Sequence, residues 1–355
     1  MPLDVSADLV TLLRAVVDIE SVSGNEAHLA DVVEATLRGH AHLQVDRLGD
    51  TVIARTQSAR DERVVIAGHL DTVPVAGNLP SWVADGRVYG RGTCDMKGGV
   101  AVALKVACTI TEPTRDVTWI FYDHEEVEAT KNGLGRVARE RPDLLAADFA
   151  VLMEPTGAVV EGGCQGTLRF LLTTRGLAAH SARAWLGHNA IHDLADVLAT
   201  LQAWDARTVT VDGLDYCEGL NAVRISGGVA GNVIPDTCTL EINYRFAPDK
   251  SLEDAEALVR ELFPKHELEL TDASPGARPG LDQPAAARFV EAVGGTPRPK
   301  FGWTDVSRFS ALGIPAVNFG PADPGKAHAD DEFCPIDDLT TCHDALVRWL
   351  TADAS

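Results

Sequence analysis

The sequence predicts an α/β fold in two parts. The main domain is expected to have a mostly parallel central sheet flanked by helices, and the inserted α+β domain an antiparallel sheet. Three observations support this prediction. Short β-rich runs alternate with helical patterns in the first half of the chain, Thr-rich and Val-rich alternation follows, and a Pro/Gly-rich stretch precedes a return of helix and strand patterns. The length of 355 residues and the hydrophobic content of 45% allow more than one core.

The first part of the chain predicts two helices, followed by strands around a buried helix. Residues Leu9–Leu37 place apolar side chains at helical spacing, and a break at residues 21–25 predicts a turn between two helices. The Ala-rich and Val-rich stretch Gly98–Ile110 predicts a buried helix. The expected strands are Thr51–Ala54, Val64–Ala67, Val117–Tyr122 and Phe149–Met153. Strands that alternate with helices predict a mostly parallel sheet.

From about Gly166 the pattern predicts the inserted domain. Its expected strands are Thr167–Thr174, Thr208–Val211, Asn221–Ser226 and Cys238–Phe246, and its expected helices are Asn189–Ala203 and Leu252–Leu262. The Pro/Gly-rich stretch Ser274–Pro284 then predicts a return linker. We therefore expect the main, catalytic domain at residues 1–165 and 275–355, and the inserted domain at residues 166–274. The catalytic domain is then discontinuous in the sequence.

Composition and charge argue against several classes of protein. No stretch approaches the roughly 20 apolar residues of a membrane-spanning helix, and the N-terminus lacks the basic start and apolar run of a signal peptide. Seven cysteines without a C-x-x-C pair favour free thiols in a reducing compartment, so we expect a cytoplasmic protein. The net charge of −21 argues against nucleic acid and membrane as partners, and an anionic substrate would need a local group of Arg or Lys side chains.

Two side chains of the kind that bind metals follow the second expected strand. The run VVIAGHLDTVP carries His69 and Asp71 at the carboxyl end of the strand, which is where open α/β sheets bind their ligands. Side chains two residues apart in an extended chain point the same way, so the Asp71 carboxylate could accept a hydrogen bond from the His69 imidazole. A metal-bound histidine commonly has such a partner. Alone, this pair is more typical of a solvated strand end than of a metal site.

Three further runs place acidic residues just after strands, and a histidine follows late in the chain. They are Asp95 in YGRGTCDMKGG, Glu125 and Glu126 in IFYDHEE, Glu154 in MEP, and His328 in KAHADDE. Taken singly, each has an ordinary explanation, such as a helix cap for Asp95. Together they predict a metal site with nitrogen and oxygen ligands, which suits Zn, Co or Mn. Of two adjacent carboxylates, one can bind metal while its neighbour moves protons.

These residues resemble a known family, the zinc-dependent amidohydrolases that include aminoacylases, acetylornithine deacetylases and glutamate carboxypeptidases. The matching motifs span nearly the whole chain: GHLDTVP (68–74), GRGTCDMKGG (90–99), DHEE (123–126), MEP (153–155), GLAAHSA (176–182) and GNVIP (231–235). The resemblance implies a hydrolase of linear amide bonds with two Zn²⁺ per subunit, for which Co²⁺ could substitute. It further implies that Asp95 bridges the two ions, with His69 and Glu154 completing one site and Glu126 and His328 completing the other.

The resemblance also implies roles for residues that do not hold metal. Glu125 would be the general base that takes a proton from the metal-bound water and returns it to the leaving amine. Asp71 would orient His69. His180, on the inserted domain, would reach the active site of a partner subunit and stabilise the oxyanion. A homodimer is then implied, with the inserted domain as its dimerisation and lid domain.

The wording of the motifs, including GWTDVSRF at 302–309, most resembles the branch of the family that removes succinate from N-succinyl-LL-2,6-diaminopimelate, a precursor of lysine and peptidoglycan. The expected substrate is therefore an anionic N-acyl amino acid. Arg245 matches an anion-binding arginine of this branch, and Asn232 of the GNVIP motif is a second candidate substrate contact. The pair Cys164-Gln165 stands where the branch has an arginine, and Arg183 is a candidate for the missing positive charge.

Two other hypotheses stay open at this point. The first keeps the same chemistry with a different substrate, as in an acetylornithine deacetylase, a broader aminoacylase or a dipeptidase. The second is a catalytically silent metal-binding or scaffold protein with the same fold. The presence of Glu125, the one acid of the motifs that is not needed as a ligand, argues against a silent protein.

Overall fold

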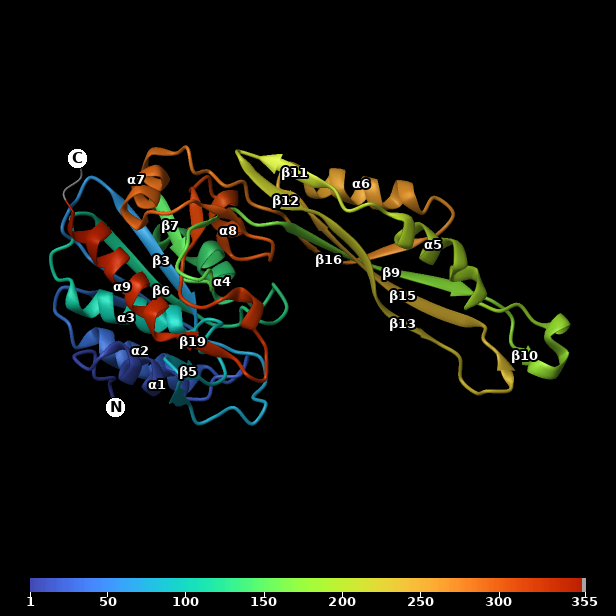
Figure 1. Cartoon of the computed structure of the whole chain (residues 1–355), viewed down its shortest axis with the longest axis horizontal. Coiled ribbons are helices and arrows are strands. Elements are labelled where there is room, and N and C mark those ends of the chain that lie inside the picture. Colours follow the sequence, from blue (N-terminus) through green and yellow to red (C-terminus); the bar gives the residue numbers. More distant parts are fainter. Residues whose placement is uncertain (353–355) are drawn as a thin grey trace. The chain divides into compact units, whose positions relative to one another are not determined.

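The structure is a computed structural model that describes residues 1–352, and these residues form two compact units (Figure 1). Unit 1 consists of Met1–Gly162, Pro279–Arg298 and the chain from Thr304 onward. Unit 2 consists of Gly163–Arg278 and Pro299–Trp303. Among the described residues, no helix combines the length and the apolar character that crossing a membrane requires.

Unit 1 is built on a mixed sheet with parallel central strands. In the described part of the chain this sheet has eight strands in the order β1-β2-β6-β3-β7-β18-β8-β17. β6, β3, β7 and β18 pair in parallel, whereas β1, β2 and β8 pair antiparallel with their neighbours. The bounds are β1 Gln44–Leu48, β2 Thr51–Arg55, β3 Arg63–His69, β6 Asp116–Tyr122, β7 Phe149–Leu152, β8 Glu161–Gly162, β17 Arg298–Pro299 and β18 Ala316–Asn318. A small separate sheet joins β4 (Trp82–Ala84), β5 (Arg87–Tyr89) and β19 (Phe333–Pro335).

Helices flank this sheet, and the apolar core of unit 1 lies between them and the strands (Figure 1). The helices are α1 Leu9–Val17, α2 Ala27–Arg38, α3 Lys97–Thr109, α4 Gly133–Glu140, α7 Pro284–Val293, α8 Val306–Ala311 and α9 Ile336–Thr351. α3 packs on β3 and also contacts α1, α2 and α9. A side chain at Gly99 would come within 2.2 Å of the Met153 carbonyl oxygen, so glycine permits the close approach of α3 to the end of β7. The buried Lys97 ammonium donates to the Ile19 carbonyl at 2.8 Å and ties the start of α3 to the chain after α1.

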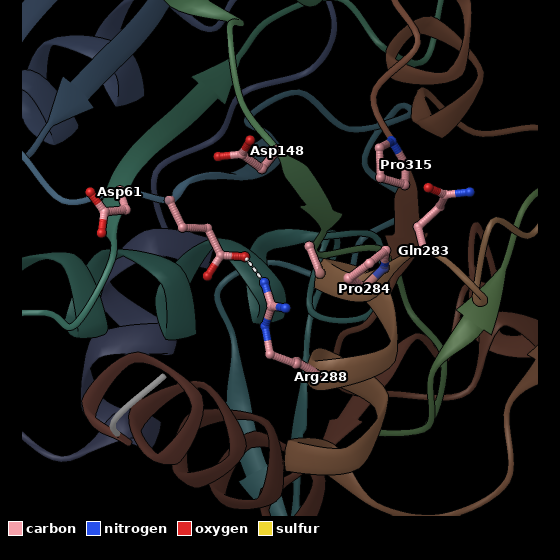
Figure 2. A pocket seen from close by; sticks show the side chains of 8 residues that line it. Asp61, Asp148, Gln283, Pro284, Arg288 and Pro315 are labelled. Atoms are coloured by element: carbon pink, nitrogen blue, oxygen red, sulfur yellow. Dashed lines mark hydrogen bonds and ion pairs between the residues drawn. The ribbon is translucent and has the colours of Figure 1, made fainter. Parts of the chain in front are cut away.

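The two edges of the parallel strands differ in character. At the amino ends of β3, β7 and β18 lies a pocket of about 590 Å³ (Figure 2). Arg288 and Glu62 line this pocket and form an ion pair at 2.7 Å. His69, the first of the expected metal ligands in the chain, lies at the opposite edge, because it is the last residue of β3. The seven residues of β3, about 20 Å of extended chain, therefore separate the pocket from those ligands.

Unit 2 is an α+β unit with an antiparallel four-stranded sheet in the order β13-β15-β9-β16. Its strands are β9 Gly166–Arg175, β10 Ala179–His180, β11 Thr208–Val211, β12 Leu214–Cys217, β13 Gly219–Gly227, β14 Val233–Ile234, β15 Thr237–Phe246 and β16 Leu268–Ser274. Its α-helices are α5 Ala195–Ala203 and α6 Leu252–Leu262. Along β15 every second residue from Cys238 to Phe246 is buried, because this face of the sheet packs with both helices into the core of unit 2.

The predicted fold class is confirmed: unit 1 has the mostly parallel sheet and unit 2 the antiparallel one. The expected helix at Asn189–Ala203 was predicted too long. The α-helix covers only Ala195–Ala203, and a 3-10 turn, His192–Leu194, precedes it. The Asn189 side chain accepts the Ile191 N–H at 2.9 Å, a local bond that favours a turn over a helix. The pattern does not predict β1, β16 or α4, whose sequences (QVDRL, LELTDAS and GLGRVARE) contain many polar residues or glycines.

Candidate metal centre

The predicted ligands of unit 1 lie at the carboxyl edge of three neighbouring strands, in the sheet order β6-β3-β7. His69 is the last residue of β3, Glu125 and Glu126 follow β6 in the chain, and Glu154 follows β7. Asp95 lies in the turn that leads into α3. Parallel strands end at the same edge of a sheet, so side chains far apart in the sequence come together there.

Asp95 lies between the two predicted histidine ligands. The Oδ1 atom of Asp95 is 3.1 Å from Nε2 of His69, and its Oδ2 atom is 3.5 Å from Nε2 of His328. Nε2 of His328 is also 3.0 Å from Oε1 of Glu126. One ligand atom each from His69, Asp95 and Glu126 fits within 4.8 Å of the others, so these three side chains could hold a metal ion. A carboxylate that offers one oxygen to each side has the geometry needed to bridge two ions.

The pKa values in this cluster reflect the attraction between imidazoles and carboxylates. Hydrogen bonds to Asp95 and Glu126 raise the pKa of His328 to about 10. Burial by itself would lower the pKa of His69, but Asp95, Asp71 and Glu125 raise it well above its usual value. Burial opposes the ionised form of Asp95, yet hydrogen bonds from His328 and His69 lower the pKa of its carboxyl. Without a bound cation, the carboxylates therefore favour the protonated, positively charged form of both imidazoles.

The pKa of Glu125 is shifted in the opposite direction from that of Asp95. Removal from water raises the pKa of its carboxyl well above the usual value. The nearby His69 lowers this pKa, whereas the negative charges of Glu154, Asp305 and Glu126 raise it further. A carboxyl group whose pKa is raised holds a proton more readily, which suits it to accept a proton and give it back during a reaction.

The structure places the Asp71 carboxylate differently from the prediction. Nδ1 of His69 lies 3.0 Å from the main-chain carbonyl oxygen of Asp71, whereas it is 3.6 Å from Oδ1 of the Asp71 carboxylate. The predicted carboxylate hydrogen bond is therefore wrong. The carboxylate instead accepts the N–H groups of Glu125 at 2.9 Å and Glu126 at 3.0 Å, and the Ser23 hydroxyl at 2.7 Å. Asp71 thus contacts His69 through its main chain and the Glu125-Glu126 turn through its side chain.

Glu154 is buried just beyond β7. Its negative charge contributes to the raised pKa of Glu125, so its carboxylate lies in the same cluster of charges. The close group formed by His69, Asp95 and Glu126 does not include it. The structure therefore joins four of the five predicted ligands in one continuous set of contacts, with Glu154 in the same group of charges as Glu125.

Unit 2 separates the remaining predicted residues into two groups. His180 ends β10, and its Nδ1 accepts the Ala182 N–H at 3.1 Å. Arg183 follows in a 3-10 turn, and the Asn232 carbonyl accepts the Ser181 N–H at 2.9 Å, so these three predicted residues lie at one end of unit 2. Arg245 pairs with Thr167 and Gly219 near the other end of β15. The eight steps from Thr237 to Arg245 measure about 26 Å in extended chain.

Two buried residues near the cluster were not predicted from the sequence. Glu332 accepts the N–H groups of Cys94 and Asp95, and Arg91 pairs with Glu332 at 2.8 Å. Glu332 belongs to the acidic run after His328, and no sequence pattern distinguishes it from its exposed neighbours Asp330 and Asp331. The next residue, Phe333, is apolar, and it is the only local sign in the sequence that the chain turns inward at this point.

A cluster of this kind can bind divalent cations and can move a proton at the water beside them. The site lies at the edge of the sheet where α/β proteins carry out their chemistry. The class of protein that the fold and the site define is therefore a metal-dependent hydrolase.

Comparison with known proteins identifies the family. Residues 65–352 match the model of peptidase family M20/M25/M40. A Mycobacterium tuberculosis protein named "Putative succinyl-diaminopimelate desuccinylase DapE" is 54% identical over 351 residues, which cover 98% of this chain and 99% of the relative. A succinyl-diaminopimelate desuccinylase of Corynebacterium glutamicum is 47% identical over 360 residues, with 98% of each chain covered. The chain belongs to peptidase family M20/M25/M40 and is a hydrolase that acts on amide bonds.

Solved structures show the same fold at lower identity. A tripeptidase from Staphylococcus aureus has a TM-score of 0.79 and 21% identity, and the match covers 99% of this chain and 98% of that one. A Bacillus subtilis protein described as a dinuclear metal-binding peptidase of the M20 family has a TM-score of 0.72 and 16% identity, with 96% of each chain covered. At these identities the likeness concerns the fold alone.

Metal binding by this protein should release protons. A cation requires neutral imidazoles, and the pKa of His328 is raised to about 10, so His328 must lose a proton when metal binds. The raised pKa of His69 acts in the same direction. The apparent affinity should therefore increase with pH, roughly tenfold per pH unit for each proton released. Calorimetric titration of the metal-free protein with Zn²⁺ in buffers of different ionisation enthalpy would measure the protons. A pH-independent affinity with no proton release would contradict the prediction.

Proposed function

We propose that this protein hydrolyses N-succinyl-LL-2,6-diaminopimelate to succinate and LL-2,6-diaminopimelate, a step toward lysine and peptidoglycan precursors. The observation that carries the proposal is the identity of 54% and 47% to two relatives with this name, over 98% of this chain in each case. The seven cysteines are free thiols, which supports a reducing, cytoplasmic location as part of the same proposal.

The donor atoms of the cluster fit two zinc ions per subunit. Nitrogen and oxygen donors without a thiolate suit Zn²⁺, with Co²⁺ as a substitute. In the proposed arrangement Asp95 bridges the ions, His69 and Glu154 complete one site, and Glu126 and His328 complete the other. The contacts of both Asp95 oxygens with histidines support this division. When bound, the ions would supply a water of lowered pKa and would polarise the amide carbonyl.

Within this proposal Glu125 is the general base. It takes the proton of the attacking water and later gives it to the leaving amine, for which its raised pKa suits it. Asp71 holds the main chain of Glu125 and Glu126, which keeps the base beside its ligand neighbour. His180, from a partner subunit, stabilises the negative oxygen that forms on the substrate carbonyl.

We also propose that unit 2 forms the homodimer contact and acts as the lid. β13 is an edge strand of its sheet, and among the described residues it pairs only with β15. Its side chains Val223 and Ile225 are 55% and 52% exposed. An edge strand with exposed apolar side chains is suited to pairing with a second copy.

The charge of −21 makes an anionic substrate depend on local cations, and Arg183, Arg245 and Asn232 are the proposed contacts for its carboxylates.

A substrate panel tests the proposed function. With added zinc, the protein should hydrolyse N-succinyl-LL-2,6-diaminopimelate with a kcat/KM about 100-fold above that for N-acetylornithine or a dipeptide, because those compounds lack the succinyl carboxylate that the site would bind. Release of the free amine would be measured for each compound. A preference for acetylornithine or the dipeptide would overturn the substrate. Bound zinc without hydrolysis of any compound would support a silent metal-binding protein.

The base assignment has its own test. Glu125→Gln keeps the size of the side chain but removes the proton acceptor, so kcat should fall by at least about 100-fold while the zinc content stays that of the wild type. Metal analysis and kinetics on the same preparation would separate the two effects. Glu128→Gln is a matched control, since Glu128 is an exposed acid close by that pairs with Lys131. Substantial activity in the Glu125 variant would show that another group moves the proton.

The contribution of His180 across subunits can be tested by mixing two inactive variants. If His180 acts in the partner's site, a heterodimer of Glu125→Gln and His180→Ala chains contains one site with both groups intact. Random exchange of subunits should then restore about a quarter of the wild-type activity. If His180 acts within its own chain, every site in the mixture lacks one group and no activity returns.

A further inference from the structure

Glu332 joins the loop that carries His328 to the turn that carries Asp95. It lies four residues after His328 and directly before β19, and it is only 1% exposed. Its Oε1 atom accepts the main-chain N–H groups of Cys94 at 2.9 Å and Asp95 at 3.1 Å. A buried carboxylate therefore fixes the backbone of the very residue that lies between the two histidines.

Arg91 completes this connection on the other oxygen. Its Nη1 atom donates to Oε2 of Glu332 at 2.8 Å and to the Ala329 carbonyl at 3.2 Å. Its Nε atom donates to the Pro74 carbonyl at 3.0 Å. Arg91 is itself 3% exposed. The pair therefore links three segments of unit 1: the segment after β3, the segment before α3, and the loop with His328.

Several contacts hold the His328 loop near the cluster: besides those of Arg91, the Asn78 side chain donates to the Asp330 carbonyl at 3.3 Å, and the Gly90 N–H donates to the Glu332 carbonyl at 3.2 Å. The His328 side chain is 52% exposed, and its backbone has a φ of 65°, a conformation that residues other than glycine seldom adopt. Such a backbone persists only where the surroundings hold it in place. The contacts of Ala329 and Glu332 with Arg91 are buried anchors of this kind immediately after His328.

Glu332 is not a further metal ligand in this geometry. Both of its oxygens already accept hydrogen bonds from buried donors, two from main-chain N–H groups and one from a guanidinium. Its charge is compensated by Arg91 rather than left for a cation. The side chain therefore acts through Asp95 and His328.

We propose that Glu332 and Arg91 are positioning residues that set the separation of Asp95 and His328 and thereby the affinity of the metal site that these two side chains share. This inference rests on the metal ions of the proposed function. Residues that support metal ligands from behind commonly change metal affinity by about 10- to 100-fold when they are replaced.

Glu332→Gln is the first test. Both carboxylate oxygens of Glu332 accept hydrogen bonds. Glutamine keeps the size of the side chain, but its amide N–H groups would face one of these donors. Titration of the metal-free full-length protein with Co²⁺ alone should show one of two sites weakened by about 10- to 100-fold, with a changed visible absorption spectrum of the bound Co²⁺. At saturating metal, KM for the substrate should stay that of the wild type while kcat recovers.

Two further variants complete the experiment. Asp331→Asn removes the same charge from the same loop, but Asp331 is exposed and pairs with Lys326, so its Co²⁺ affinity and spectrum should stay those of the wild type. Arg91→Lys keeps the positive charge and loses the forked contact, and an intermediate loss of affinity is expected. Circular dichroism of each metal-free variant reports folding, and Arg91→Lys decides the question if Glu332→Gln does not fold.

Unchanged Co²⁺ affinity and spectrum in the folded variants would overturn the positioning role. The titrations contain no substrate, so this outcome is independent of the substrate panel. A wild-type protein that binds two Co²⁺ ions but does not cleave the succinylated compound would overturn the proposed function and leave the positioning role standing.

Discussion

Negative charge crowded at the carboxyl edge of β6, β3 and β7 is the constraint on which the rest of the site depends. The negative charges of Glu154, Asp305 and Glu126 all raise the pKa of Glu125, in addition to the effect of its burial. Carboxylates withdrawn from water repel one another strongly and persist only with positive or N–H partners. Two imidazoles, whose pKa values are raised in response, supply part of that compensation. Divalent cations would replace the imidazole protons, so metal binding is an electrostatic consequence of the fold as well as a requirement of the chemistry.

The same arrangement of hydrogen bonds positions the main chain at two places in the site. The Asp71 carboxylate accepts the consecutive N–H groups of Glu125 and Glu126, and the Glu332 carboxylate accepts those of Cys94 and Asp95. Each buried acid follows a predicted histidine ligand in its own loop, Asp71 after His69 and Glu332 after His328. Each loop with a histidine thus holds a turn with a carboxylate, and the predicted metal ligands are connected in pairs through the backbone.

This arrangement also explains how far the sequence could predict the site. Apolar runs with a metal-binding type of residue just after them predict the strands and the edge at which His69, Glu126 and Glu154 meet, because parallel strands end together. The role of the Asp71 carboxylate could not be predicted, because its donors lie 54 and 55 residues away and main-chain N–H groups have no sequence signature. Glu332 is 237 residues from Asp95, and within an acidic run it resembles a solvated side chain. In the fold, β1 could not be predicted for a similar reason. Its sequence is polar, and its strand conformation depends on its pairing with β2.

The separation within unit 2 would give the proposed homodimer a geometric role. His180, Arg183 and Asn232 lie beyond the start of β15, whereas Arg245 lies near its end, and about 26 Å of extended strand separates the two groups. An N-acyl amino acid is much shorter than this distance, so one copy of unit 2 cannot place both groups on one substrate molecule. If both groups contact the substrate, as proposed, they must come from two copies. Under that proposal, the length of the antiparallel sheet of unit 2 would make a complete binding site depend on the association of two copies.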